Sequence, residues 1–366
     1  MNDAKWTLIV GMGVVGLPTA LQLAAAGIPL ILCDDDIVTQ ENLRKQRFFA
    51  RHVGAPKVVA ADELIRAHVP TARTRLLPVD ARTLGVGFFL EHLSCVLACV
   101  DGRGSEAFLA RQCNLTGLPY VREATRGESR VVDVTFVPAP RNASDPCGAC
   151  TFTERDLALA DARYRCGGTA NNPAAGALTF AEHGSLAASL TVDALLRNEL
   201  SPARTIRFTG GLQPRLETTL LPNSAGCRLA DPRWGHGPAR WVSSGRMDQL
   251  RVGQLLQAAC EQLDSTSEEL SCQLDLALCP VRLCRKCGAS TGPGFYQHGR
   301  AAPRCERCAG LIEQCPRPAV REVSGIVLES LAECTLAELG APCGAGFRFV
   351  NGEQRQFDVC AAADTV

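Results

Sequence analysis

Residues 8–57 decide the fold of this chain, because they place a glycine loop, an acidic triplet and a polar, basic segment in a fixed order. The stretch reads Leu8-Ile-Val-Gly11-Met-Gly13-Val-Val-Gly16, then Leu30-Ile-Leu-Cys-Asp34-Asp-Asp36, then Glu41-Asn42-Leu-Arg-Lys45-Gln46 and Gly54-Ala-Pro-Lys57. An apolar strand that runs into Gly-x-Gly-x-x-Gly and a helix is typical of a phosphate-binding turn, since the glycines let the backbone approach an anion at the helix N-terminus. The sequence therefore predicts a nucleotide-binding strand, turn and helix.

The second strand of this unit, residues 29–33, ends in acidic side chains. A carboxylate at the end of the second strand suits the hydroxyls of a ribose. On these residues alone, an NAD-dependent dehydrogenase is as good an interpretation as any other nucleotide-binding enzyme.

Hydrogen-bond donors and cations crowd into the segment after the ribose position: Asn42, Arg44, Lys45, Gln46, Arg47, Arg51 and Lys57. A dehydrogenase has no evident need of them, whereas cations placed on a triphosphate stabilise its charge during phosphoryl or adenylyl transfer. The alternative interpretation is a solvated basic helix, which is what most charge runs are.

The order of these residues resembles that of ubiquitin-activating enzymes and their bacterial relatives, the molybdopterin-synthase and thiazole-biosynthesis adenylyltransferases of the ThiF type. The resemblance covers roughly residues 5–200 and implies an α/β fold with a Rossmann-like, mostly parallel sheet. It implies a nucleotide site formed by Gly11, Gly13, Gly16, Asp34, Asp36, Asn42, Lys45, Gln46 and Lys57. In this set Asp34 takes the ribose position and Lys57 the phosphate position. Lys45 stands where the family has Arg, which keeps the charge but loses the planar, bidentate fork.

A later aspartate, Asp101, follows the apolar strand 95–100. The resemblance implies that Asp101 helps to hold Mg²⁺ and that it acts in catalysis together with Lys57. Gly102 replaces the usual Asn here, and Glu106 stands where an Arg is common. The resemblance also implies a homodimer in which the partner supplies an Arg from its N-terminal segment, although Lys5 is the sole cation before the glycine loop.

Two Cys-x-x-Cys pairs, Cys284/Cys287 and Cys305/Cys308, are separated by a glycine-rich, apolar-poor segment. Four thiolates at this spacing suit a tetrahedral Zn²⁺ ion, and such a segment needs metal to fold. The pairs are therefore predicted to bind a structural zinc. The basic residues around them also permit a nucleic-acid ribbon, but docking of a protein is the preferred interpretation.

A second group of cysteines precedes the expected core helix: Cys147, Cys150 and Cys166. Relatives of the ThiF type pair such a Cys-x-x-Cys with a later one to bind zinc, and here the later position offers only Cys227. The resemblance places the nucleophile that attacks the adenylated C-terminus at Cys166, with Cys147 and Cys150 as alternatives. Arg163 and Arg165 flank Cys166, and cations favour a thiolate.

Length and composition agree with a multidomain intracellular protein. A chain of 366 residues suits two or three domains. The expected division is an adenylation domain (1–221, with a crossover loop at about 138–175), a linker and helix (222–278) and a zinc-cluster and recruitment domain (279–366). Basic and acidic residues balance at 38 each, so neither nucleic acid nor membrane is an expected partner. With no signal peptide or membrane span in the sequence, the 19 cysteines suit thiols and metal ligands, and a cytoplasmic location is expected.

Together these features predict ATP-dependent adenylation of the C-terminus of a ubiquitin-like protein, followed by a thioester on Cys166 and transfer to a conjugating enzyme. The setting that the resemblance suggests is a bacterial ubiquitin-like conjugation system, with antiviral defence as one use. The expected cofactors are ATP, Mg²⁺ and Zn²⁺. Two alternatives stay open: a sulfur-carrier-protein adenylyltransferase of cofactor biosynthesis, and a non-catalytic nucleotide-binding protein with a zinc ribbon.

Overall fold

The structure is a computed structural model, and it describes most of the chain. The described residues are 5–126, 130–141, 145–150, 152, 177–211, 213–222, 227, 241–284, 286–295, 304–310, 312–314, 320–341 and 344–362. They form two compact units, one of Met1–Ala81 with His92–Pro238 and one of Arg82–Glu91 with Ala239–Val366. The functional division at residues 222 and 279 stays a prediction.

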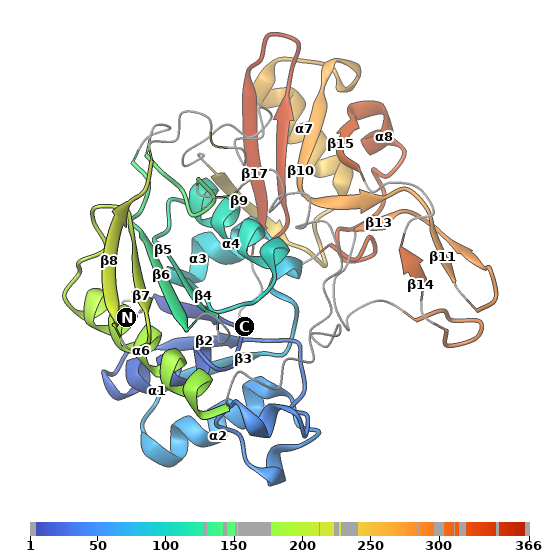
Figure 1. The fold of residues 1–366 in the computed structure, drawn as a ribbon. Helices are drawn as coiled ribbons and strands as arrows, with labels where there is room; N and C mark the ends of the chain where they lie inside the picture. Colours follow the sequence, from blue (N-terminus) through green and yellow to red (C-terminus); the bar gives the residue numbers. More distant parts are fainter. Residues whose placement is uncertain are drawn as a thin grey trace. The chain divides into compact units, whose positions relative to one another are not determined.

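The first unit is built on an eight-stranded sheet with the strand order β3-β2-β1-β4-β5-β6-β7-β8 (Figure 1). Its strands are β1 (Trp6–Val10), β2 (Leu30–Cys33), β3 (Thr74–Leu77), β4 (Leu93–Ala98), β5 (Tyr120–Arg126), β6 (Val131–Val137), β7 (Arg204–Thr209) and β8 (Arg215–Leu220). The strands from β3 to β5 pair in parallel, and those from β5 to β8 pair antiparallel. The predicted α/β fold with a Rossmann-like sheet is confirmed.

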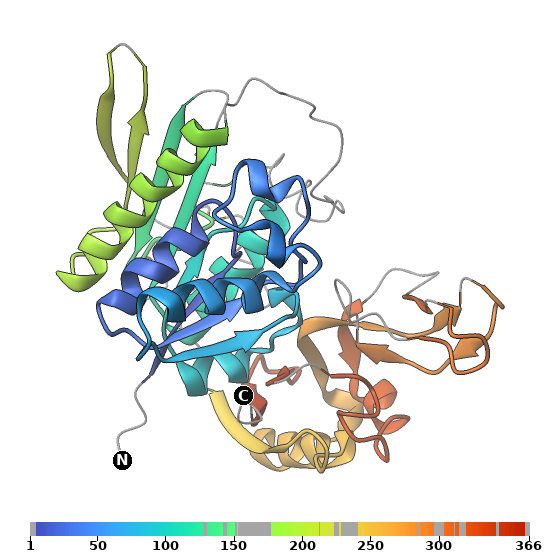
Figure 2. The ribbon, with the colours of Figure 1, turned by 90° about the horizontal axis from the view of Figure 1, so that it is seen from below.

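Helices cover both faces of this sheet. On one face α1 (Gly16–Ala25) and α6 (Ala177–Leu196) run side by side (Figure 2), and α1 also contacts α2 (Lys57–His68). Beneath them lies a continuous apolar core that includes Ile9 of β1 and Leu32 of β2. A further long helix, α4 (Arg103–Thr116), packs against β4 and β5. Short 3₁₀ turns connect these elements at η1 (Asn42–Arg44), η2 (Ala50–His52) and η3 (Ala81–Thr83).

The strand order places the candidate site. The chain leaves β1 toward β2 on one side and reaches β4 on the other, so the sheet has a switch point between β1 and β4. In open α/β sheets, ligands bind at such a point, beyond the carboxyl ends of the strands. The glycine loop after β1, the acidic triplet after β2 and Asp101 after β4 all lie beyond these ends.

The second unit contains a six-stranded sheet with the order β13-β10-β16-β17-β9, and β15 also pairs with β10. Its elements are β9 (Trp241–Arg246), α7 (Val252–Leu263), η4 (Ser267–Glu269), β10 (Ser271–Cys279), β13 (Gly294–Phe295), β15 (Val320–Ser324), α8 (Gly325–Glu329), β16 (Gly346–Val350) and β17 (Gln356–Ala362). Strands β11 (Arg282–Cys284), β12 (Ser290–Thr291) and β14 (Ile312–Gln314) form a separate small sheet. Residues 241–246, expected in a linker, form β9 because they pair in parallel with β17.

A segment from the first half of the chain completes this second unit. Helix α3 (Val86–His92) begins where the Val86 N–H donates a 2.9 Å hydrogen bond to the buried Asp275 carboxylate. Phe88 and Phe89 are fully buried, and the Gly87 N–H donates to the Gly344 carbonyl at 2.8 Å. The crossover between β3 and β4 is therefore part of the core of the second unit. Among the described helices of the whole chain, none is both long and apolar enough to cross a membrane.

Candidate active site

The glycine loop has no room for side chains at two of its positions. Gly11 has φ of +93°, and a Cβ atom there would lie 2.6 Å from the Cys99 carbonyl oxygen. A Cβ atom on Gly16 would lie 1.8 Å from the Gly11 carbonyl oxygen. The turn between β1 and α1 therefore closes only with glycine, and its backbone stays open to an anion.

Asp34, at the predicted ribose position, is tied to the glycine loop. Its Oδ2 accepts a 2.6 Å hydrogen bond from the Met12 N–H, and its Oδ1 accepts one of 2.9 Å from the Asp36 N–H. The pKa of the Asp34 carboxyl is raised, because the effect of burial outweighs Lys57 and the two backbone donors, which lower it. The Asp34 carboxylate thus holds the glycine loop and the acidic triplet in place, in addition to its predicted contact with a ribose.

Lys57 lies beside these acids at the first residue of α2. Its Nζ is 2.8 Å from Asp36 Oδ2 and 3.9 Å from Asp34 Oδ2, and its side chain is only 9% exposed. The Lys57 N–H also donates to the Asp36 carbonyl at 2.9 Å. Lys57, the predicted phosphate-binding cation, therefore lies beside the acidic triplet that follows β2, and the glycine loop follows the neighbouring strand β1.

The polar segment between Asp36 and Lys57 is not a basic helix but two short 3₁₀ turns, η1 and η2. Asn42 Oδ1 accepts a 2.9 Å hydrogen bond from the Thr39 N–H and so shapes the first turn. Gln46 Nε2 lies 3.7 Å from where a Cβ atom of Gly13 would be. Gln46 Oε1 is buried and has no hydrogen-bond partner among the described residues. Lys45 is exposed.

Asp101 follows β4, and α4 begins two residues later at Arg103. Close to it, sequence reasoning missed an ion-pair cluster centred on Glu106, which is 2% exposed. Arg103 Nη1 lies 2.6 Å from Glu106 Oε2, and Arg122 Nε lies 2.8 Å from Glu106 Oε1. The signal in the sequence was Glu106 itself, because an acidic residue that replaces an Arg and is buried needs cations beside it.

These residues fit a nucleotide. Two glycines leave no room for a Cβ atom, an orphaned Gln46 oxygen lies beside the loop, and a cation and carboxylates gather at the switch point. A model of the family described as "ThiF family" matches residues 3–229. The chain belongs to the ThiF family.

Curated relatives of this ThiF-family chain carry adenylyltransferase names. The "Adenylyltransferase and sulfurtransferase uba4" of Aspergillus fumigatus is 33% identical over 160 residues, which cover 41% of this chain and 31% of that protein. The protein of the same name from Emericella nidulans is 29% identical over 245 residues, covering 62% of this chain and 48% of that protein. The matches thus cover only 31% and 48% of the length of these two relatives.

Solved structures with a similar fold include Escherichia coli MccB with ATP. Its TM-score is 0.46 at 17% identity, and the match covers 62% of this chain and 66% of that chain. A crystal structure of PaaA gives a TM-score of 0.42 at 17% identity, with 60% and 64% covered.

The second unit of this ThiF-family chain brings together the four sulfurs of the paired Cys-x-x-Cys motifs. Cys284 Sγ lies 3.4 Å from Cys308 Sγ, and Cys287 Sγ lies 3.6 Å from Cys305 Sγ. All four lie within 4.8 Å of one another. The Cys287 backbone N–H, helped by the Lys286 N–H and the neighbouring thiols, outweighs burial and lowers the pKa of Cys284 to about 6, which favours a thiolate. The donor set and its spacing fit tetrahedral Zn²⁺, whose Zn–S bonds of about 2.3 Å separate sulfurs by slightly under 4 Å.

The first unit holds a second, smaller sulfur cluster. Cys147 Sγ lies 3.5 Å from Cys227 Sγ and 3.8 Å from Cys150 Sγ, and the three sulfurs lie within 4.8 Å of one another. Interactions with the Cys150 and Cys227 thiols, followed by burial, raise the pKa of Cys147. The Cys147 thiol lowers the pKa of Cys150, but Cys227 and burial outweigh it and raise that pKa to about 11. Cys166 lies outside the described residues.

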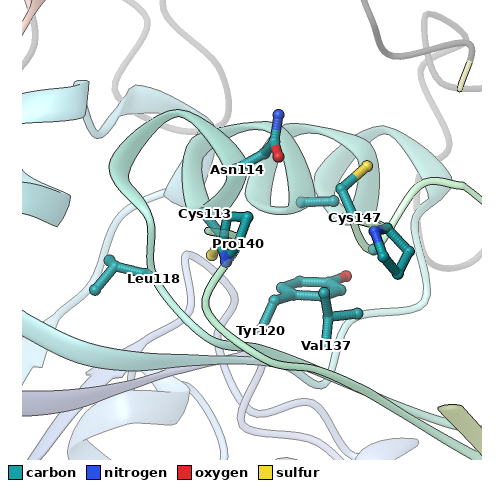
Figure 3. Close-up of a pocket in the computed structure, with 10 residues that line it drawn as sticks. Cys113, Asn114, Leu118, Tyr120, Val137, Pro140 and Cys147 are labelled. Carbon is teal, nitrogen blue, oxygen red and sulfur yellow. The ribbon is translucent and has the colours of Figure 1, made fainter. Parts of the chain in front are cut away.

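A small pocket lies beside Cys147, under α4 and above the Tyr120 ring (Figure 3). Its lining is mostly apolar and includes Cys113, Leu118 and Val137. None of the residues of the nucleotide site lines it. This pocket is therefore distinct from the candidate nucleotide site.

Proposed function

We propose that this chain uses ATP to adenylate the C-terminal carboxylate of a small carrier protein of the ubiquitin-like type. The proposal is supported by the contacts of Lys57 with Asp34 and of Gln46 with the glycine loop, and by Asp101, which follows the neighbouring strand β4. Membership of the ThiF family and the adenylyltransferase names of the relatives support it.

In the proposed reaction ATP lies over the glycine loop with its ribose toward Asp34. Asp34 keeps lone pairs for ribose hydroxyls, because each of its oxygens accepts a hydrogen bond from one backbone N–H group. Lys57, Lys45, Asn42 and the Nε2 amide of Gln46, which lies beside Gly13, would donate to the phosphate oxygens. Asp101 would hold Mg²⁺, which supplies positive charge to the phosphate oxygens when bound.

The chemical step exchanges one bond to phosphorus for another. A carboxylate oxygen of the carrier forms a bond to the α-phosphorus, and the bond from that phosphorus to the bridging oxygen breaks. Pyrophosphate leaves with the electron pair, and an acyl-adenylate remains. Cations and backbone N–H groups fixed around the phosphates stabilise the charge that develops in this step.

For the fate of the acyl-adenylate we favour the sulfur-carrier pathway, because the named relatives combine adenylyltransferase and sulfurtransferase in one protein. Transfer to Cys166 as a thioester, which releases AMP, is the second candidate. Cys147 and Cys150 are weaker nucleophiles, because their raised pKa values keep them protonated. We assign the zinc-cluster region of the second unit to recruitment of the carrier or of a downstream protein.

Carrier-dependent exchange of labelled pyrophosphate into ATP tests the proposal. Candidate ubiquitin-like proteins with free C-termini are added to the wild-type chain, to Asp101→Asn and to Asp193→Asn, a matched surface control on α6 that pairs with Arg197 at 2.7 Å. Exchange is expected in the wild type and the control and is expected to fall by roughly a hundredfold or more in Asp101→Asn. Nucleotide binding without exchange by any carrier would favour the non-catalytic alternative.

A further inference from the structure

Glu123 is a fully buried carboxyl group close to the glycine loop. It lies on β5, its residue is 1% exposed, and no cation forms an ion pair with it among the described residues. The other buried glutamate among the described residues of this unit, Glu106, has two arginines as partners. An unpaired carboxylate at such a depth is costly, so a neutral, protonated carboxyl group is the favoured state.

The contacts of Thr19 indicate where the proton lies. Thr19 Oγ on α1 is 2.8 Å from Glu123 Oε2 and 3.0 Å from the Val15 carbonyl oxygen. A hydroxyl group has one hydrogen, and the Val15 carbonyl can only accept. Both contacts are satisfied when Thr19 donates to Val15 and a protonated Glu123 donates to Thr19. Val15 precedes the first residue of α1, so this chain of hydrogen bonds ends at the glycine loop.

A second contact links Glu123 to the loop from the other side. The Cys99 thiol faces the carboxyl group. The Cys99 carbonyl oxygen lies 2.6 Å from where a Cβ atom of Gly11 would be. The Cys99 Cβ atom lies 3.2 Å from where a Cβ atom of Gly16 would be. Glu123 is therefore linked to the glycine loop in two places: through Thr19 to Val15, and through Cys99 to Gly11 and Gly16.

We propose that Glu123 is a positioning residue that carries a proton, and that in this neutral form it sets the glycine loop for the polyphosphate of ATP. An ionised Glu123 would lose its donor contact with Thr19 and would place a negative charge behind a site for anions. Nucleotide binding is thereby coupled to the protonation of one buried side chain. The phosphate part of this inference rests on the proposed function, whereas the proton on Glu123 does not.

The surroundings of Glu123 allow this equilibrium to move near neutral pH. Burial raises the pKa of Glu123 to about 7, and the hydroxyl and thiol groups that face it lower the value less. Those groups come from Thr19 on α1, Thr191 on α6 and Cys99 after β4, and Cys99 is the only titratable one among them. The register partner on β6 is the apolar Val134.

The first test measures the Kd for MgATP by calorimetry from about pH 6 to about pH 9 in the wild type, Glu123→Gln and Asp133→Asn. Asp133 is a buried carboxylate on β6 that pairs with Arg207 at 2.7 Å, so Asp133→Asn controls for loss of a buried acid. Above about pH 7 the wild-type Kd is expected to rise by up to about tenfold per pH unit relative to that of Glu123→Gln. The titration of ATP itself is common to all three proteins and cancels in the comparison. Parallel curves, or weak binding by Glu123→Gln at every pH, would overturn the proposal.

The second test uses no nucleotide. The folded pKa of Glu123 is raised to about 7 from an ordinary value of 4.5, so its neutral form contributes stability that is complete below the ordinary value and is lost as the pH rises through about 7. The melting temperature of Glu123→Gln minus that of the wild type is therefore expected to increase across this window and then level off. A flat difference would show that Glu123 holds no such proton. Failure of the wild type to bind ATP, with the expected stability window present, would instead overturn the proposed function and the phosphate part alone.

Discussion

The backbone N–H of Met12 donates a 2.6 Å hydrogen bond to the carboxylate of Asp34. This contact joins the glycine loop after β1 to the end of β2, and the second oxygen of Asp34 accepts the Asp36 N–H. Asp34 thus stabilises the loops of the site even when no nucleotide is bound. The nucleotide site is built from side chains that also hold the loops in place, and mutations there have effects on stability as well as on activity.

Asp34→Ala is expected to destabilise the protein even without nucleotide. The substitution leaves the Met12 and Asp36 N–H groups without their acceptor, and one unsatisfied buried donor costs about 1–3 kcal/mol. Asp34→Asn keeps one acceptor oxygen and should lose less. The free energy of unfolding in urea measures both effects. Wild-type stability in Asp34→Ala, combined with lost ATP binding, would mean that the carboxylate serves only the ligand.

Lys57→Met is expected to reduce pyrophosphate exchange by roughly a hundredfold or more, because it removes a buried cation from the phosphate side of the site. Lys57→Arg retains the charge and should retain part of the activity. Arg197→Met, which removes an exposed cation that pairs with Asp193 at 2.7 Å on α6, is the control and should exchange like the wild type. Equal rates in Lys57→Met and Arg197→Met would remove Lys57 from the proposed mechanism.

Cys287→Ser should lower the zinc content of the purified chain by about one equivalent, since its sulfur lies 3.6 Å from Cys305 Sγ in the four-thiol cluster. The segment between the Cys-x-x-Cys pairs should then become sensitive to protease, while ATP binding persists. Elemental analysis and limited proteolysis measure the two effects. Unchanged zinc content in Cys287→Ser would contradict a metal at this cluster.

The three-thiol cluster is expected to hold zinc less tightly than the four-thiol cluster, because the described residues supply only three sulfurs there. Titration with a chelator should therefore release metal in two phases. Cys227→Ser should abolish the weaker phase and Cys287→Ser the stronger one. A single phase that Cys227→Ser leaves unchanged would show that Cys147, Cys150 and Cys227 bind no metal.

Cys166→Ala is expected to leave adenylate formation intact and to prevent any thioester with the carrier. Mass spectrometry of the protein after incubation with ATP and carrier, with and without a thiol reductant, measures the adduct. A thioester survives the reductant in part, whereas an acyl-disulfide does not survive it. An adduct that persists in Cys166→Ala would move the nucleophile to Cys147 or Cys150.

Local patterns in the sequence predicted the parts of the site that depend on neighbouring residues. The glycine loop, the carboxylates after β2 and the paired Cys-x-x-Cys motifs each have their signal within a short window. In the structure the loop and the carboxylates follow β1 and β2, and the four thiols of the paired motifs lie within 4.8 Å of one another. The helix N-terminus and the switch point then follow from the strand order.

Contacts between distant residues could not be predicted in this way. Thr19 and Glu123 meet across 104 positions, and nothing in the sequence around either one indicates the other. Likewise, residues 241–246 lack the composition of a buried strand and become β9 only because β17 lies beside them. The Thr19–Glu123 contact and strand β9 depend on tertiary packing, which a local sequence pattern does not indicate.

The most direct test of the central claim follows an oxygen atom. The C-terminal carboxylate of the carrier is labelled with a heavy oxygen isotope, incubated with ATP and the wild-type chain, and the nucleotide products are weighed by mass spectrometry. Attack of that carboxylate on the α-phosphorus predicts one labelled oxygen in the AMP that is released, with unlabelled pyrophosphate. Unlabelled AMP, or ADP and phosphate in its place, would contradict adenylation of the carrier by this protein.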